Sequence, residues 1–278
     1  MSSVVTEFAP AKINLALHVL GRRADGYHEL DSVVAFADVG DVLTFAPASK
    51  TDLSVDGAFA LDAPTTNDNL VLRAYSALAQ RGALPAVAMH LTKNLPVASG
   101  IGGGSADAAA ALRGLMRLFD LRFDAETMRE MALSLGADVP VCLNGKACRM
   151  QGVGDIITPL EQLPAHAILL VNPLQACGTK DVFRSMGLKT GDDAGLALDL
   201  NTPSTWRNDM TDAAQRVLPV IIEVLTALEA LPSTVAVRMS GSGATCFALM
   251  DRYADAVLAE QQLRLTHPYW WCAAARLS

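Results

Sequence analysis

A glycine-rich stretch ahead of an alanine-rich segment constrains this 278-residue chain more than any other feature. Residues 95–112 read LPVASGIGGGSADAAAAL, with glycine at Gly100 and at 102–104. Glycine loses much backbone entropy on folding and has no side chain to pack, so this density of glycine indicates that the fold needs a bare backbone here. The four alanines at 108–111 and the one-face spacing of the apolar residues after them predict a helix.

Ser105 is the predicted N-cap of that helix, because a serine hydroxyl can accept a hydrogen bond from an N–H group of the first turn. A glycine loop that leads into a helix directs N–H groups and the positive end of the helix dipole towards one point, which predicts an anion site, most often for phosphate. A plain strand-to-helix turn is the alternative, although one or two glycines would suffice for it. The stretch is not a Walker loop or a Gly-x-Gly-x-x-Gly turn, since no Gly-Lys follows and Ser105 takes the place of the third glycine.

The composition favours a chain with a large buried core that does not bind nucleic acid. Hydrophobic residues make up 51 % of the sequence, and the net charge of -7 provides no basic surface for a phosphate backbone. The five cysteines lack metal-ligand spacing, which predicts reduced thiols in a cytoplasmic protein. We see no signal peptide and no apolar run of membrane-spanning length, so no membrane partner is expected.

Two further segments place polar side chains where they could form a site. Residues 11–20 alternate as in a β-strand and put Lys12 and Asn14 on one face, which is either a solvated strand face or a functional one. Asp138 follows a predicted helix that begins after Asp124 and ends at Gly136, and the next helical turn is expected to be blocked by Pro140. A carboxylate past a helix C-terminus should be exposed or have a cationic partner.

Four segments together resemble the GHMP small-molecule kinases. Residues 96–106, PVASGIGGGSA, are similar to the ATP-binding motif of that family, and the others are APAKINL at 9–15, RADGYHEL at 23–30 and LGADVPV at 135–141. In this order they resemble the branch that phosphorylates a cytidine diphosphate derivative of methylerythritol, a small molecule of the non-mevalonate isoprenoid pathway. The resemblance runs from about Pro10 to the end of the chain. It implies an α+β GHMP kinase fold of two lobes, 1–158 and 159–278, with the active site in the cleft between them.

The resemblance also implies roles for individual residues. Asp138 would accept or orient the proton of the substrate hydroxyl, with Lys12 beside it as the cationic partner. ATP, with Mg²⁺ bound to Ser105, would be held by Pro96, Val97, Ala98, Ser99, Gly100, Ile101, Gly102, Gly103, Gly104, Ser105 and Ala106. The substrate would contact Asn14, Tyr27, His28, Asp138, Thr179 and Phe183, with Tyr27 and Phe183 on the two faces of the cytosine ring and His28 at its edge.

The sequence departs from the family pattern at three positions, where Ala98 replaces glycine, Ile101 replaces leucine and Ala106 replaces serine. Ala98 matters only if that position needs a positive φ angle. Two rival interpretations stay open: another GHMP kinase, of mevalonate or homoserine type, and a non-catalytic nucleotide-binding protein. The Tyr27–His28 pair argues against the first, and the presence of both Lys12 and Asp138 argues against the second.

Smaller expectations concern the remaining segments. Asn67 or Asp68 is predicted to cap a helix that extends to about Arg81. Residues 190–205 are expected to form a mobile loop, followed by a helix capped by the pair 208–209. The segment 240–243, Ser-Gly-Ser-Gly, is either a simple hairpin turn or the counterpart of the third glycine motif of the family.

Overall fold

The structure, a computed structural model, describes residues 4–64, 66, 68–161 and 167–278. The chain divides into two compact units that alternate along the sequence. Unit 1 comprises residues up to Ala11, 39–97 and 102–145, whereas unit 2 comprises 12–38, 98–101 and 146–278. Two long strands, β1 (Val5–Arg22) and β2 (His28–Pro47), contribute to both units. The sequence division at residue 158 stays a prediction about the two sequence domains of the family.

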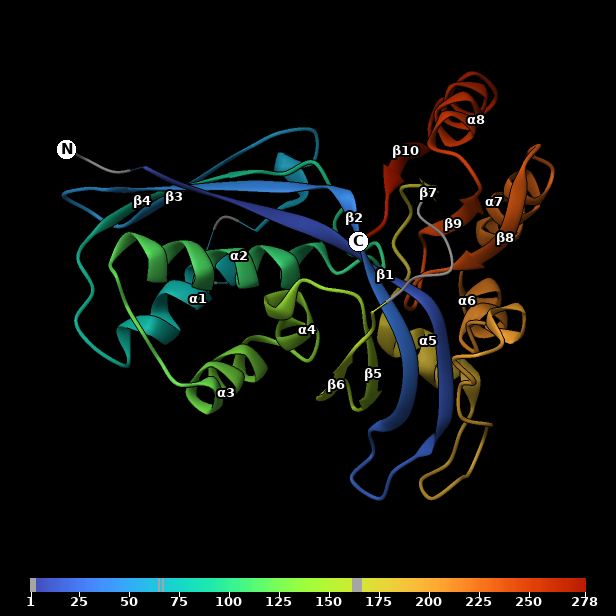
Figure 1. The fold of residues 1–278 in the computed structure, drawn as a ribbon, viewed down its shortest axis with the longest axis horizontal. Helices are drawn as coiled ribbons and strands as arrows, with labels where there is room; N and C mark the ends of the chain where they lie inside the picture. Colours follow the sequence, from blue (N-terminus) through green and yellow to red (C-terminus); the bar gives the residue numbers. More distant parts are fainter. Residues whose placement is uncertain (1–3, 65, 67, 162–166) are drawn as a thin grey trace. The chain divides into compact units, whose positions relative to one another are not determined.

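Unit 1 combines a sheet with helices on one of its faces (Figure 1). Strand β4 (Val87–Thr92) pairs antiparallel with the second half of β2 and parallel with β3 (Asp52–Asp56). The alanine-rich helix α2 (Gly103–Leu118) is buried along most of its length, as alanines with small side chains allow. The other elements of this unit are η1 (Ala60–Asp62), α1 (Leu70–Ala79), α3 (Ala125–Leu135) and α4 (Val139–Asn144).

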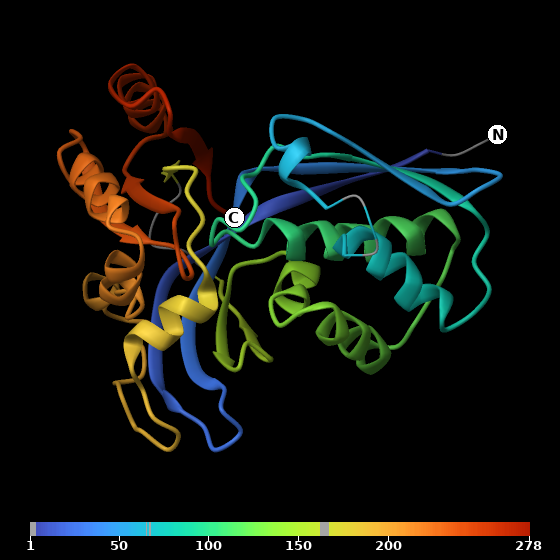
Figure 2. The same ribbon diagram turned by 180° about the vertical axis from the view of Figure 1, so that it is seen from behind.

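Unit 2 is built on an antiparallel sheet in the order β10-β7-β9-β8, whose strands are labelled in Figure 1. Figure 2 shows the same ribbon from behind. All six residues of β7 (Ala167–Asn172) are buried, as expected for a central strand that is covered on both faces. Helices α7 (Val220–Glu229) and α8 (Tyr253–Thr266) pack against this sheet. The remaining elements are β5 (Cys148–Gly152), β6 (Ile156–Pro159), α5 (Thr179–Met186), η2 (Pro203–Thr205), α6 (Thr211–Val217), β8 (Thr234–Met239), β9 (Cys246–Met250) and β10 (Trp271–Arg276).

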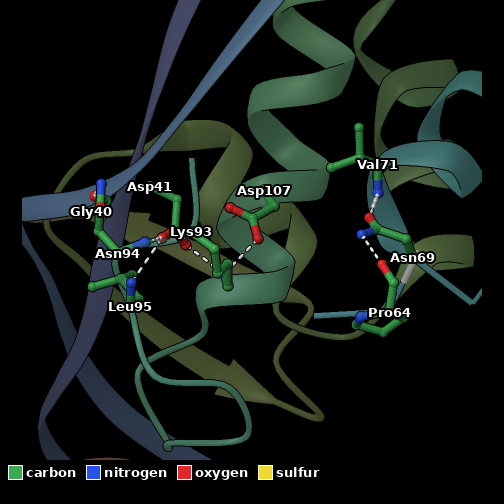
Figure 3. Close-up of polar contacts among 9 residues, drawn as sticks. All are labelled: Gly40, Asp41, Pro64, Asn69, Val71, Lys93, Asn94, Leu95 and Asp107. Atoms are coloured by element: carbon green, nitrogen blue, oxygen red, sulfur yellow. Dashed lines mark hydrogen bonds and ion pairs between the residues drawn. The ribbon is translucent and has the colours of Figure 1, made fainter. Parts of the chain in front are cut away.

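The predicted cap of α3 is confirmed, and the predicted cap of α1 is wrong. Asp124 caps α3, since its carboxylate accepts a hydrogen bond from Thr127 N at 2.7 Å. Helix α1 is capped by Asn69 instead of Asp68, because the Asn69 side chain accepts from Val71 N at 2.9 Å and donates to a backbone carbonyl of the preceding turn (Figure 3). The other predicted cap, Asn67, lies outside the described residues. Within the described ranges, no helix is both long enough and apolar enough to cross a membrane.

Candidate active site

The glycine-rich loop adopts a left-handed backbone at three positions. The φ angles are +52° at Ala98, +79° at Gly100 and +64° at Gly102. Gly102 is the N-cap of α2, so the prediction that Ser105 is the cap is wrong: the left-handed glycine lets the helix begin at Gly103, and Ser105 lies in its first turn. No side chain caps this helix end, and its first N–H groups have no carbonyl partner within the helix.

The three departures from the family pattern fall in different environments. Ala98 is exposed and has a positive φ, so this residue carries a strain of about 1–2 kcal/mol that glycine would not. Ile101 is fully buried, where an apolar exchange with leucine is tolerated. Ala106 is also buried, which places its methyl group inside unit 1. Of the three departures, only Ala98 places a side chain on a left-handed backbone position.

The first part of the loop is braced by the turn between β8 and β9. Ser240 Oγ donates to Gly100 O at 3.1 Å, and Thr245 N donates to Ser99 O at 3.1 Å. A Cβ atom on Gly100 would lie 2.6 Å from the carbonyl oxygens of both Ser240 and Gly243. The segment 240–243 is thus a hairpin connection that also packs against the glycine loop, and its match to the third glycine motif of the family stays a prediction.

The side chain of Asn208, which was predicted to cap a helix, instead holds the turn between β8 and β9 in position. Asn208 Nδ2 donates to Met239 O and Gly241 O, each at 2.8 Å, and Asn208 Oδ1 accepts from Met210 N at 3.0 Å. Helix α6 begins at Thr211 without a side-chain cap, so the predicted capping role of residues 208–209 is wrong. An amide side chain can satisfy donors and acceptors at once, and here it binds the hairpin instead of a helix end.

Strand β1 brings Lys12 and Asn14 to the loop from the other side. Lys12 N donates to Ile101 O at 2.9 Å, and Asn14 N donates to Ser240 Oγ at 3.1 Å. The exposed fractions of these residues are 4 % and 1 %, so the interpretation of a solvated strand face is wrong. Asn14 Nδ2 donates to Ser32 Oγ at 2.8 Å, whereas Asn14 Oδ1 is buried without a hydrogen-bond partner among the described residues. This oxygen can accept a hydrogen bond from a ligand.

The predicted ring-binding residues lie in unit 2. His28 stacks on Phe183 of α5, with the ring centroids 4.1 Å apart and an interplanar angle of 15°. Burial, followed by the nearby positive charge of Arg22, lowers the pKa of His28, which favours the neutral imidazole, and its Nε2 has no hydrogen-bond partner among the described residues. Tyr27 is 65 % exposed, and the arrangement of Tyr27 and Phe183 around a ligand ring stays a prediction. Thr179, the first residue of α5, has its hydroxyl 2.7 Å from Ser242 Oγ.

Asp138 lies in unit 1, at the N-cap of α4. The prediction that Pro140 would stop the helix from resuming is wrong, because proline is tolerated in a first turn, where its missing N–H group would have no partner. Asp138 is therefore at the favourable end of a new helix and not only past the end of α3. Lys12 belongs to unit 2, and its pairing with Asp138 stays a prediction.

Comparison with known proteins places this geometry in a family. The profile described as GHMP kinases N terminal domain matches residues 69–146, and the profile described as GHMP kinases C terminal matches residues 188–267. The chain is 49 % identical over 283 residues to the 4-diphosphocytidyl-2-C-methyl-D-erythritol kinase of Paramagnetospirillum magneticum, with 97 % of each chain covered. It is also 49 % identical to the protein of that name from Ruegeria pomeroyi, over 98 % of this chain and 99 % of the relative. The chain belongs to the GHMP kinase family.

Solved structures agree with this assignment. A crystal structure of 4-(cytidine 5'-diphospho)-2C-methyl-D-erythritol kinase matches with a TM-score of 0.84 at 32 % identity, over 98 % of this chain and 99 % of that one. The homoserine kinase from Cytophaga hutchinsonii matches with a TM-score of 0.72 at 17 % identity, which shows the fold alone. The predicted family and the predicted α+β fold are confirmed. Membership in a kinase family implies ATP as the phosphoryl donor.

The sequence analysis of this GHMP kinase missed a buried charge cluster next to α2. The Lys93 ammonium lies between two carboxylates, 2.5 Å from Asp41 Oδ2 and 2.7 Å from Asp107 Oδ2 (Figure 3). Burial, and then repulsion by Asp41, outweigh the attraction of Lys93 and raise the pKa of Asp107 to about 7. A signal did exist, since Asp41 interrupts an apolar strand pattern and Asp107 interrupts an alanine-rich helix.

A second buried ion pair fastens the segment that was expected to be a mobile loop. Asp31 binds Arg149 through two hydrogen bonds of 2.8 and 2.6 Å and accepts from Leu198 N at 2.9 Å. Further back, Ala194 N donates to the backbone of β1 at 2.8 Å. Residues 194–198 are therefore bonded to the rest of unit 2 at both ends, to β1 and to Asp31. Burial opposes ionisation of Asp31, but the hydrogen bonds from Arg149 and Leu198 outweigh it, so that its pKa lies below the usual value.

The replacement Asp31→Asn is expected to lower the free energy of unfolding by about 2–3 kcal/mol at neutral pH, because it leaves a partly buried guanidinium without its counter-charge. A lowered pKa contributes stability above the pKa of the unfolded chain, about 3.9, and this stability is lost as the pH falls through the folded-state pKa. The difference between wild type and variant should therefore shrink below about pH 4. Urea unfolding at several pH values measures it.

The control for this experiment is Asp181→Asn, whose carboxylate pairs with Arg184 on the exposed surface of α5 at 2.7 Å. Exposed pairs contribute little, so this variant should unfold like the wild type. Equal losses in the two variants, or a loss in Asp31→Asn that does not change with pH, would show that the buried pair has no special role.

Proposed function

We propose that this GHMP kinase transfers the γ-phosphoryl group of ATP to the 2-hydroxyl of 4-(cytidine 5'-diphospho)-2-C-methyl-D-erythritol, a step of the non-mevalonate route to isoprenoid precursors. The observation that carries the proposal is the 49 % identity, over 97 % of the chain, to a relative named for that activity. The site residues of both units support it, as follows.

The loop 96–106 suits ATP because its helix end offers N–H groups without a capping side chain. Gly104 in the first turn of α2 is exposed, so its backbone is accessible to phosphate oxygens. We propose that Mg²⁺ arrives with the nucleotide and takes the hydroxyl of Ser105 as a ligand. One hydroxyl from the first turn is a sufficient donor, since Mg²⁺ commonly keeps waters and phosphate oxygens as its other ligands.

Lys12 and Asp138 are the proposed catalytic residues. Phosphoryl transfer passes through a loose transition state that depends mainly on positioning and on neutralisation of charge. Asp138 would orient the substrate hydroxyl and accept its proton, and Lys12 would stabilise the carboxylate and the developing negative charge. The burial of Lys12 in β1 supports this assignment, because a buried lysine needs an anionic partner.

The proposed substrate contacts lie in unit 2. A neutral His28 has one ring nitrogen that donates and one that accepts, which matches the donor and acceptor edge of cytosine. Tyr27 and Phe183 would stack on the ring, where each contact contributes about 0.5–1.5 kcal/mol beyond burial. Asn14 Oδ1, which has no partner among the described residues, would accept a hydrogen bond from a hydroxyl of the sugar-alcohol chain. Thr179 would contact the same substrate.

A coupled assay of ADP release tests the proposal. The wild-type enzyme should turn over the cytidine substrate and leave mevalonate and homoserine unchanged. Phosphorylation of either of those two without turnover of the cytidine substrate would replace the specific assignment by another GHMP kinase. A thermal shift with ATP but no turnover of any of the three would favour the non-catalytic alternative.

The proposal includes a cytoplasmic location and a small molecule as the partner. All five cysteines are buried thiols outside any disulfide, which fits a reducing compartment. Labelling of the unfolded protein from fresh cell extract should find five reduced thiols.

A further inference from the structure

We propose that Lys93, held between Asp41 and Asp107, is a positioning residue for ATP binding: it fixes the distance between the strand that leads into the glycine loop and the helix that follows it. The inference rests on the proposed function as an ATP-dependent kinase and adds residues that lie outside the loop motif. All three residues belong to unit 1: Asp41 is in β2, Lys93 directly follows β4, and Asp107 is in α2.

The residues before the loop are fixed by Asp41. Its Oδ1 accepts from Asn94 N at 2.6 Å and from Leu95 N at 2.8 Å, directly before Pro96 begins the loop. Its Oδ2 binds the Lys93 ammonium, so one carboxylate holds both the side chain and the next two backbone N–H groups (Figure 3). The backbone of Lys93 is held as well, since its N–H donates to Asp56 O at 2.7 Å.

The residues after the loop are fixed by the same ammonium. Asp107 lies one turn beyond Gly103, and its Oδ2 accepts from Lys93 Nζ at 2.7 Å. A Cβ atom on Gly103 would lie 3.2 Å from Lys93 Nζ and 3.6 Å from Leu95 Cβ. Glycine at this position lets the ammonium approach the first residue of α2. The helix end that offers N–H groups to phosphate is therefore attached to the strand end through one buried side chain.

Stability alone does not account for this cluster. Taking three charges out of water costs several kcal/mol per ion, and well-packed apolar side chains of similar volume often give equal or greater stability. The cluster instead connects the two ends of the loop by directional bonds, and catalysis by phosphoryl transfer is sensitive to the placement of phosphate. A shift of the helix start relative to the strand end would weaken ATP binding before it affected the other substrate.

The test uses the double variant Lys93→Met with Asp107→Leu, which keeps the volume and removes the lysine–aspartate pair. Asp41 keeps its bonds to Asn94 and Leu95 but loses the ammonium that balances its buried charge, which lowers the stability of the variant. We expect a folded protein whose KM for ATP rises by about tenfold or more, whereas kcat and the KM for the cytidine substrate change by less than about threefold. Asp107→Asn, which retains shape and a weaker acceptor, should show a smaller rise in the KM for ATP.

The matched control removes the other buried ion pair, by Asp31→Leu with Arg149→Met in unit 2, and should leave the KM for ATP within about twofold. An unchanged KM for ATP in the folded Lys93 variant would overturn the proposal, as would equal rises in both KM values. If the double variant does not fold, the KM for ATP of Asp107→Asn decides instead: an unchanged value would overturn the proposal. Equilibrium binding of ATP, by titration calorimetry, needs no turnover and separates failure of this inference from failure of the proposed function.

Discussion

The replacement Asp138→Asn is expected to reduce kcat by about 10²–10⁴-fold while the affinity for ATP stays within a few fold. Asparagine keeps the shape of the side chain but cannot accept the proton of the substrate hydroxyl. The fold should tolerate the change, since the Asp138 side chain makes no capping hydrogen bond in α4 and asparagine has nearly the same shape. Steady-state kinetics, together with calorimetric titration of ATP, separate the loss of rate from a loss of binding.

Asp120→Asn provides the control for this prediction. Asp120 is a carboxylate of the same unit, is almost fully exposed and has a positive φ that asparagine also adopts readily. It should behave as the wild type in both measurements. Unchanged turnover of Asp138→Asn would assign Asp138 a structural role at the helix end and would remove the proposed acid–base chemistry.

The sequence predicted the parts of this fold that depend on local pattern. The glycine stretch, the alanine-rich helix and the alternation of residues 11–20 are local signals, and each corresponds to an observed element. The family and the fold followed from motifs in a fixed order, and the comparisons confirm both. Motif order carries this information because each motif marks one turn or strand end of a common fold.

The errors arose where the outcome depends on backbone conformation or on distant partners. Ser105 is a good capping residue, but the left-handed Gly102 starts the helix earlier. Pro140 stops a helix that is already running yet fits the first turn of a new one, and local pattern does not distinguish these cases. Asp41 and Lys93 are 52 positions apart, so their contact could not be inferred from spacing. The contact of Asn208 with the hairpin was missed for the same reason, because Asn208 and the hairpin carbonyls it binds are more than 30 positions apart.

The two halves of the glycine-rich loop are held by different parts of the chain. Gly100 lies against Ser240 and Gly243, and Ser240 Oγ also accepts from Asn14 N, so one hydroxyl bonds both to the loop and to the strand that carries Lys12. The second half of the loop is attached to α2 and, through Lys93, to β4. A change in the first half should therefore affect both the stability of unit 2 and the binding of ATP.

The replacement Gly100→Ala is accordingly expected to lower the free energy of unfolding by about 3–5 kcal/mol. The added Cβ would lie 2.6 Å from two backbone carbonyl oxygens, which cannot rotate away as a side chain would, and φ at this position is +79°. The variant that remains folded should also bind ATP at least about tenfold more weakly, because the loop must move away from the hairpin.

Ala98→Gly is the matched control, since it is two residues earlier in the same loop, at a φ of +52°. Ala98 already strains the backbone at this position, so its replacement by glycine should leave the free energy of unfolding unchanged or raise it by up to about 1 kcal/mol. Urea unfolding and calorimetric titration of ATP on both variants test this contrast. Wild-type stability of Gly100→Ala would mean that the glycine-rich loop is not held against the hairpin, and the proposed bracing of this loop by Ser240 would be wrong.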